Sequence, residues 1–151
     1  MYAASRMQAQ APAHLTSYCR RDTEFIELLQ GYRLRGGLVR AEMLIDDAGA
    51  QRQTAVLSMA RRIASRELLS FKWHESIWVP MFQFCPASLA LRPGVSEIFA
   101  ELVGAMDDWE IAQWFVTPHV ALANVTPLSR IDLDVDELRR VARVDRFVAR
   151  G

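Results

Sequence analysis

The residues best suited to metal or acid–base chemistry in this chain are three histidines and two groups of aspartates. The histidines are His14, His74 and His119, and no two have the i, i+4 spacing that places metal ligands on one helix face. None of them adjoins a cysteine. A metal site would need ligands from distant segments, so we expect none.

The aspartates fit helix capping better than catalysis. Asp107 and Asp108 precede an apolar helical segment, where carboxylates accept hydrogen bonds from free backbone N–H groups. The alternating aspartates of residues 132–136 lack the glycine that a calcium loop needs at its sixth position. The chain has no glycine-rich phosphate loop and no activating motif beside Cys19 or Cys85. The sequence therefore predicts a non-enzymatic protein with no catalytic residues, metal ligands or cofactor.

Length and composition bound the fold class. The chain has 151 residues, of which 51% are hydrophobic and 24% charged, as in an ordinary single domain. Its longest nearly apolar run, Ile77 to Phe84, is too short to cross a bilayer. Residues 1–16 lack the apolar block of a signal peptide. We therefore expect a cytoplasmic location and no membrane partner.

Charge is unevenly distributed although the net charge is zero. Residues 1–73 hold 11 Arg/Lys and 7 Asp/Glu, residues 74–138 hold 2 and 10, and residues 139–151 hold 5 and 1. A basic front, an acidic middle and a basic tail can complement one another within the fold or between protomers. The same asymmetry leaves room for an acidic partner.

Periodicity predicts a mainly α fold with one small antiparallel β-hairpin, in a compact single domain. Residues 1–21 form an expected flexible tail, and residues 22–66 a helical N-terminal part. In that part a helix is expected from Asp22 or Thr23 to the Gly36-Gly37 pair. Two further helices are expected over 38–45 and 54–65.

Residues 67–151 combine the predicted hairpin with more helices. Aromatic segments over 68–73 and 77–84 suggest the two strands, with Pro80 at an edge or irregular position. An amphipathic helix from Val95 and a tryptophan-rich helix over 109–116 follow. Two short helices are expected near 118–123 and 127–131, because each Thr-Pro pair offers an N-cap residue and a proline suited to the first helical position. A last helix begins at Asp134 or Asp136, and Trp73, Trp78, Trp109, Trp114 and Phe115 are expected in the core.

Residues 22–66 also allow a helix-turn-helix reading, since glycines separate three short helices. Arg61, Arg62 and Arg66 would then contact DNA from the third helix. The alternative is a helical packing unit whose arginines meet the acidic middle of the same chain.

The last helix carries a stripe of basic residues. Arg139, Arg143, Arg146 and Arg150 fall on one face by helical spacing. The stripe suits either a solvated face near a helix C-terminus, where cations interact favourably with the dipole, or a surface offered to a partner.

The second half of the chain resembles the toxin-binding domain of Xre/MbcA/ParS-type antitoxins. The resemblance covers residues 60–151, and the upstream helices look like the helical N-terminal part of that family. The residues that carry it are Trp78, Pro80, Phe82, Gln83, Phe84, Trp109, Trp114, Pro118, Leu122 and Pro127, with residues 141–147 matching the terminal helix. Two positions depart from the pattern: His119 replaces an asparagine, and Ala123-Asn124-Val125 stands where a glycine is usual. Asn124 is the residue expected to supply the positive φ there.

The resemblance implies a helical homodimer that binds and neutralises a cognate RES-domain toxin, an enzyme that consumes NAD. It implies that the C-terminal region, including Gly151, blocks the toxin pocket, and that the four stripe arginines take part. Some members also bind operator DNA. The alternatives are a DNA-binding regulator that uses residues 22–66 and a family member without a toxin partner.

Overall fold

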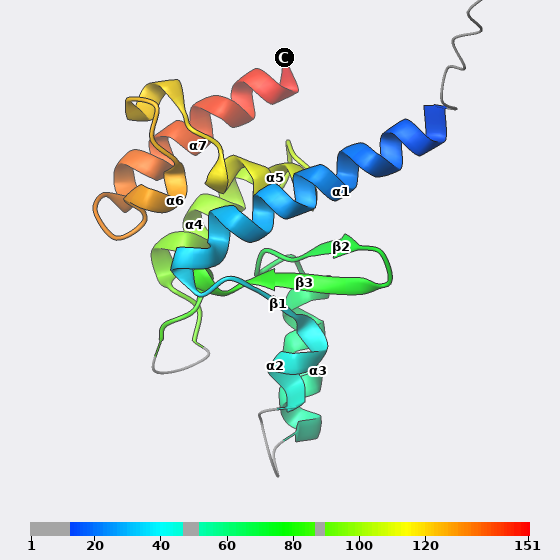
Figure 1. Cartoon of the computed structure of the whole chain (residues 1–151). Coiled ribbons are helices and arrows are strands. Elements are labelled where there is room, and N and C mark those ends of the chain that lie inside the picture. Colours follow the sequence, from blue (N-terminus) through cyan, green and yellow to red (C-terminus); the bar gives the residue numbers. More distant parts are fainter. Residues whose placement is uncertain (1–12, 47–51, 87–89) are drawn as a thin grey trace, which may run out of the picture.

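The computed structural model describes residues 13–46, 52–86 and 90–151 (Figure 1). In chain order the helices and strands are α1 (Ala13–Tyr32), η1 (Arg33–Arg35), β1 (Leu38–Arg40), α2 (Ala41–Asp46), α3 (Arg52–Ala64), β2 (Phe71–Trp73), β3 (Ser76–Pro80), η3 (Met81–Gln83), α4 (Pro93–Leu102), α5 (Asp108–Val116), η4 (Val120–Leu122), α6 (Pro127–Arg130) and α7 (Val135–Arg150). The predicted mainly α fold with a small antiparallel β element is confirmed.

The sheet has three strands in the order β1-β3-β2, all antiparallel. The predicted hairpin is β2–β3, but the expected helix over 38–45 is wrong at its start, because residues 38–40 form β1. Gly36 (φ 90°) and Gly37 (φ 73°) reverse the chain after η1, and a Cβ on Gly36 would lie 2.8 Å from the Met81 Cβ. β3 is the central strand, and Pro80 is its last residue, so Pro80 does not mark an edge.

The N-terminal helix is longer than expected. It begins at Ala13 rather than at Asp22 or Thr23, so residues 13–21 of the predicted tail are helical. Residues 1–12 of that tail lie outside the described residues. Residues 22–66 do not form a unit of three short helices, because they hold one long helix, a strand of the common sheet and the α2–α3 pair.

Most of the core lies among α1, α4, α5, α6 and α7, and Phe71 of β2 and Phe82 of η3 complete it. Figure 1 shows α1 running across the molecule beside α5, with α7 above it, and α4 packs against α7. The Tyr32 hydroxyl donates to the Ala112 carbonyl (2.7 Å), and burial raises the pKa of Tyr32. The Trp109 indole donates to Glu24 on α1 (3.1 Å). These bonds fix the long N-terminal helix on the tryptophan-rich helix.

A smaller apolar cluster joins α2 and α3 to the other side of the sheet. It contains Leu44, Met59, Leu68, Val79 and Phe84. In Figure 1 this helix pair extends away from the rest of the molecule.

The tryptophan-rich helix is positioned by local chemistry as the sequence predicts. Asp107 accepts from the Glu110 N–H, and Glu110 accepts from the Asp107 N–H, both at 2.8 Å, so the two residues form a capping box. Trp109, Trp114 and Phe115 are buried, which confirms the expected core role of this segment. Trp73 and Trp78 are only partly buried and pack at the edge of the core.

One of the two short helices expected after the Thr-Pro pairs has a different N-cap residue. Thr126 caps α6 with Pro127 at its first position, as predicted. At the other, Thr117 ends α5 by donating its hydroxyl to the Gln113 carbonyl, and His119 caps η4 instead. Ala123 and Asn124 both have positive φ (56° and 60°), so the turn uses two such residues where the sequence suggested Asn124 alone.

Candidate partner-binding site on the C-terminal helix

α7 is the most amphipathic helix of the described chain and forms its C-terminal end. Asp134, one of the two aspartates that the sequence offers for this role, caps its start by accepting from the Glu137 N–H (2.8 Å). Leu138, Val141 and Ala142 anchor it in the core. The remaining faces of α7 carry the predicted stripe, a partly buried carboxylate and an exposed apolar surface.

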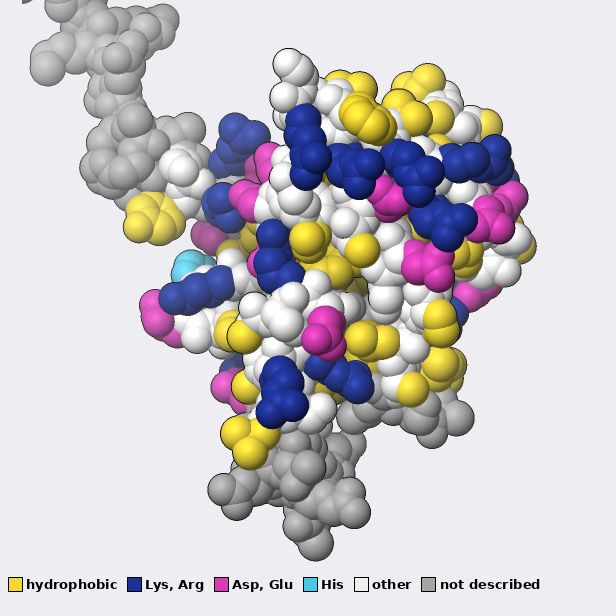
Figure 2. All heavy atoms as spheres, turned by 180° about the vertical axis from the view of Figure 1, so that it is seen from behind, with side chains coloured by type: hydrophobic (Ala, Val, Ile, Leu, Met, Phe, Trp, Pro, Cys, Tyr) yellow, Lys and Arg dark blue, Asp and Glu magenta, His cyan; other side chains and the backbone are white. Residues whose placement is uncertain are grey.

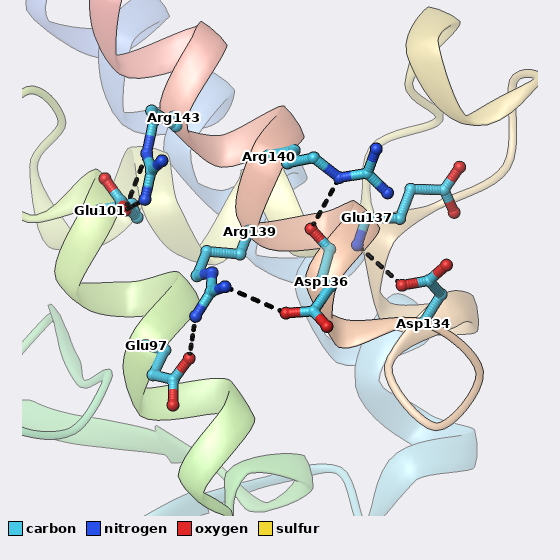
Figure 3. A network of polar contacts seen from close by, with 8 residues as sticks. All are labelled: Glu97, Glu101, Asp134, Asp136, Glu137, Arg139, Arg140 and Arg143. Atoms are coloured by element: carbon cyan, nitrogen blue, oxygen red, sulfur yellow. Dashed lines mark hydrogen bonds and ion pairs between the residues drawn. The ribbon is translucent and has the colours of Figure 1, made fainter.

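The predicted arginine stripe lies on one face of α7, and that face is turned toward α4. Figure 3 shows Arg139 between Glu97 and Asp136, and Arg143 over Glu101. The nitrogen–oxygen distances are 2.6 Å for Arg139–Glu97 and 2.7 Å for both Arg143–Glu101 and Arg146–Glu101. Three of the four stripe arginines therefore bind carboxylates of their own chain.

Glu101 is the centre of this contact. Its side chain is only 12% exposed and receives both Arg143 and Arg146. The hydrogen bond from Arg143 lowers the pKa of Glu101, opposed by burial and assisted by the charges of Arg143, Arg146 and Arg139. The same pairing raises the pKa of Arg143. The sequence did offer a signal, because Glu97 and Glu101 have the same i, i+4 spacing as Arg139 and Arg143.

Arg150 differs from the other stripe residues. Its guanidinium packs over Gly104, since a Cβ there would lie 2.7 Å from an Arg150 nitrogen. No carboxylate among the described residues pairs with it. Arg140, which lies off the stripe, bonds only the Asp136 carbonyl (3.3 Å). Arg140 and Arg150 are thus the α7 cations whose charge is not matched by an acidic side chain of the described chain.

Asp145 joins α7 to the residues of the Thr-Pro segment. Its Oδ2 accepts from the Trp114 indole (2.6 Å) and contacts His119 Nε2 (2.9 Å). His119 Nδ1 accepts from the Ala121 N–H (3.1 Å), so Nε2 carries the proton and donates to Asp145. His119, where the resembled pattern has asparagine, thereby ties η4 to α7. A pocket of about 500 Å³ opens beside this cluster, lined by Glu110 and Gln113 among others.

Asp145 is not among the site residues predicted from the sequence. A signal was present, because Asp145 falls on the same face of α7 as Leu138, Val141 and Ala142, where an isolated carboxylate needs a hydrogen-bond partner.

An exposed apolar surface covers the outer face of α7 near the end of the chain. Val144, Phe147 and Val148 follow i, i+3, i+4 spacing and are 60%, 66% and 74% exposed. Val120 of η4 is 83% exposed and follows His119, which bonds α7. Figure 2 shows hydrophobic side chains gathered above a row of Lys and Arg side chains on this face. We call Val120, Val144, Phe147 and Val148 the α7 patch.

The three residues predicted to contact DNA do not share one exposed helix face. Arg61 and Arg62 lie in the last turn of α3. Arg66 follows the helix end with φ 53° and donates to Asp108 at the start of α5 (2.7 Å). The alternative reading of the sequence, arginines that meet the acidic middle of the chain, is therefore confirmed for Arg66.

The structure also explains the positions that carry the family resemblance. Gln83 is buried, and its side chain bonds both the N–H and the carbonyl of Leu69 (2.8 Å each) and the Pro80 carbonyl (2.9 Å). Phe82, Phe84, Leu122 and Pro127 are buried, and Trp78 is partly buried, whereas Pro118 is exposed. Most of these positions are buried and stabilise the fold, so they do not form an exposed surface.

No group of three or more histidine, cysteine or acidic residues in the described parts of the chain is arranged to hold a metal ion. Cys19 and Cys85 are free thiols. The helices that the structure describes include none long and apolar enough to span a membrane.

No family model, no characterised protein and no solved structure matches this chain.

Proposed function

We propose that this chain is a non-enzymatic, antitoxin-like protein that binds and neutralises a cognate RES-type, NAD-consuming toxin through the C-terminal half of α7. The observation that supports the proposal is the α7 patch: three large apolar side chains exposed on one turn of a well-anchored helix. Isolated exposed apolar residues are common, but a contiguous group at helical spacing is typical of a protein-binding surface.

The electrostatics of α7 refine which residues would contact the toxin. Arg139, Arg143 and Arg146 are committed to Glu97 and Glu101, so breaking those pairs would oppose binding. Arg140 and Arg150 flank the α7 patch without acidic partners in the described chain, and Gly151 follows at the terminus. A partner with an apolar groove edged by carboxylates, as in a nucleotide-consuming pocket, would complement this arrangement.

Phe147→Asp tests the proposal. Coexpressed with the RES-type protein from a neighbouring reading frame, the unchanged chain is expected to co-elute with it and to suppress its loss of NAD. Phe147→Asp should weaken the complex by about 2–4 kcal/mol, the usual cost of losing an aromatic anchor. Leu57→Asp, at a 62% exposed position on α3, is the matched control and should bind normally.

Both variants change exposed side chains, so both should keep the thermal unfolding midpoint of the parent. If no complex elutes and NAD loss is undiminished, the proposed function is wrong. If the complex forms but Phe147→Asp leaves it intact, the α7 patch is not the contact. Sizing of the chain alone measures the homodimer that the family resemblance implies.

A second candidate function is DNA binding by the α2–α3 pair. It is supported by Arg61 and Arg62, which lie in the last turn of α3 and have no carboxylate partner for their side chains in the described chain. We expect any retardation of duplex DNA to weaken steeply with salt and to fall in Arg61→Ala with Arg62→Ala. Arg66→Ala should change stability rather than the salt slope, because Arg66 pairs with Asp108. No retardation at low salt would exclude this function.

A further inference from the structure

A pocket of about 720 Å³ is lined by residues of η1, β1 and η3 and by Arg92, which precedes α4. Its walls are largely apolar, and Phe82 and Phe84 on its lining are each only 3% exposed. Leu34, which is 90% exposed, stands at its opening. A hydrophobic recess open to solvent can hold the apolar body of a small molecule.

The charge of this pocket has one sign. Among the described residues that line it, Arg35 and Arg92 are the charged ones, and none is a carboxylate. Both guanidiniums converge on Asp132, which lies just outside the lining: Arg35 contacts one carboxylate oxygen, and Arg92 contacts the other at 2.5 Å. Two cations share one anion, so the pocket keeps an excess positive charge.

Arg92 is held in place for this role. Its Nε donates to the Phe84 carbonyl (3.2 Å), and its backbone N–H donates to the Gln83 carbonyl (2.8 Å). The Asp132 side chain lies in the loop between α6 and α7 and is 44% exposed, so solvent reaches it. The hydrogen bond from Arg35, followed by that from Arg92, lowers the pKa of Asp132 against the effect of burial. The two arginines thus stabilise a carboxylate in its charged form.

We propose that this pocket binds a small amphiphile with a single carboxylate, whose head group takes the place of Asp132 between Arg35 and Arg92 and whose apolar body lies against Phe82 and Phe84. The side chain of Asp132 occupies the position of the ligand's carboxylate, with one oxygen for each guanidinium. A carboxylate reproduces the charge and the two oxygens that Asp132 offers to the guanidiniums, whereas a phosphate monoester would bring about two negative charges and a further oxygen. The inference does not depend on toxin binding.

The test is calorimetric titration of the full chain with octanoate and with 1-octanol at neutral pH. We expect saturable octanoate binding and at least about tenfold weaker octanol binding, because only the carboxylate forms charge-assisted hydrogen bonds. Backbone amide resonances of Gly36 and Val39 should shift with octanoate, since both residues line the pocket.

Three variants make the test specific. Arg35→Gln should weaken octanoate binding by about tenfold or more, since it removes one charged donor. Asp132→Asn should strengthen it, because the competing carboxylate is lost. Arg40→Gln is the matched control, because Arg40 pairs with Glu42 outside the pocket, and its affinity should equal that of the parent.

Absence of saturable binding to the unchanged chain would overturn the proposal. Equal affinity for octanol, or equal loss in Arg35→Gln and Arg40→Gln, would do the same. Weaker binding in a folded Asp132→Asn would show that Asp132 assists the ligand rather than standing in for it, and would also contradict the inference. Because toxin binding is measured separately on α7, failure here leaves the proposed function intact.

Discussion

Single side chains decide how the buried frame of this protein is held together, and Gln83 is the clearest case. Its amide is 2% exposed and bonds three backbone groups of the segments around β2 and β3. The family resemblance marked this residue without giving a reason for it. The structure supplies the reason: the buried backbone of Leu69, which lies outside the strands, has its N–H and carbonyl satisfied by a side chain instead of a neighbouring strand.

Gln83→Leu should therefore destabilise the fold strongly. The substitution leaves the Leu69 N–H buried without its Gln83 partner, together with two carbonyls that lose a donor. We expect a loss of about 2–4 kcal/mol in the free energy of unfolding, measured by urea denaturation. Gln113→Leu is the control, because its side chain has no hydrogen bond among those described and is only partly buried. A loss in Gln83→Leu no larger than in the control would refute this role.

His119 takes the capping role that the sequence predicted for Thr117, and it also bonds Asp145. Thr117-Pro118 had the composition of a helix cap, yet the cap comes from His119, whose ring also bonds Asp145. This departure from the family pattern fixes η4 against α7. Val120, the residue after His119, belongs to the segment that this bond fixes.

Among the elements, α4 and α7 form the contact most dependent on charge. Glu97 and Glu101 on α4 meet Arg139, Arg143 and Arg146 on α7. The pairing orients α7 and turns Val144, Phe147 and Val148 outward. The stripe that looked available to a partner instead positions the surface that we propose for one.

This contact should weaken in acid. The pKa of Glu101 is lower in the folded chain than in the unfolded one, so its stabilisation is fully present above the unfolded value, about 4.3, and is lost as pH falls through the folded value. Between neutral pH and pH about 3, Glu101→Gln should lose less stability than the unchanged chain. Glu75→Gln, at an exposed position, should follow the unchanged chain. Parallel curves for Glu101→Gln and the unchanged chain would contradict the assignment.

Across the whole molecule, the three charge blocks of the sequence meet within one fold. The basic front reaches the acidic middle through Arg66–Asp108 and Arg35–Asp132, and the basic tail reaches it through α7 and α4. This confirms the expectation that the blocks complement one another within the chain. Because many of these charges are paired internally, the surface features that stand out are the apolar α7 patch and the arginine-lined pocket.

Long-range packing bears on the two differences from the predicted N-terminal part, the length of α1 and the strand at residues 38–40. α1 packs along α5, where Gly31 lies so close to Val116 that a Cβ would approach within 2.7 Å. Phe25, Leu28 and Tyr32 of α1 are buried, whereas residues 17–23 are exposed. The earlier turns extend from this anchored part, and the Arg21 guanidinium lies over the Trp109 ring of α5 at 4.7 Å. Residues 38–40 become a strand because β3 offers them hydrogen-bonding partners about forty residues away in sequence.

The sequence by itself determined the features that depend on near neighbours. These are the capping box at Asp107, the Thr126-Pro127 start of α6, the start of α7 at Asp134 and its amphipathic pattern, because each rests on contacts within one helical turn. Only the tertiary structure decided which face of α7 is free, since that depended on the carboxylates of α4 opposite the arginines. The Asp145 cluster and the pocket between Arg35 and Arg92 likewise join residues from separate segments, and hydrophobic packing of the whole chain sets their distances.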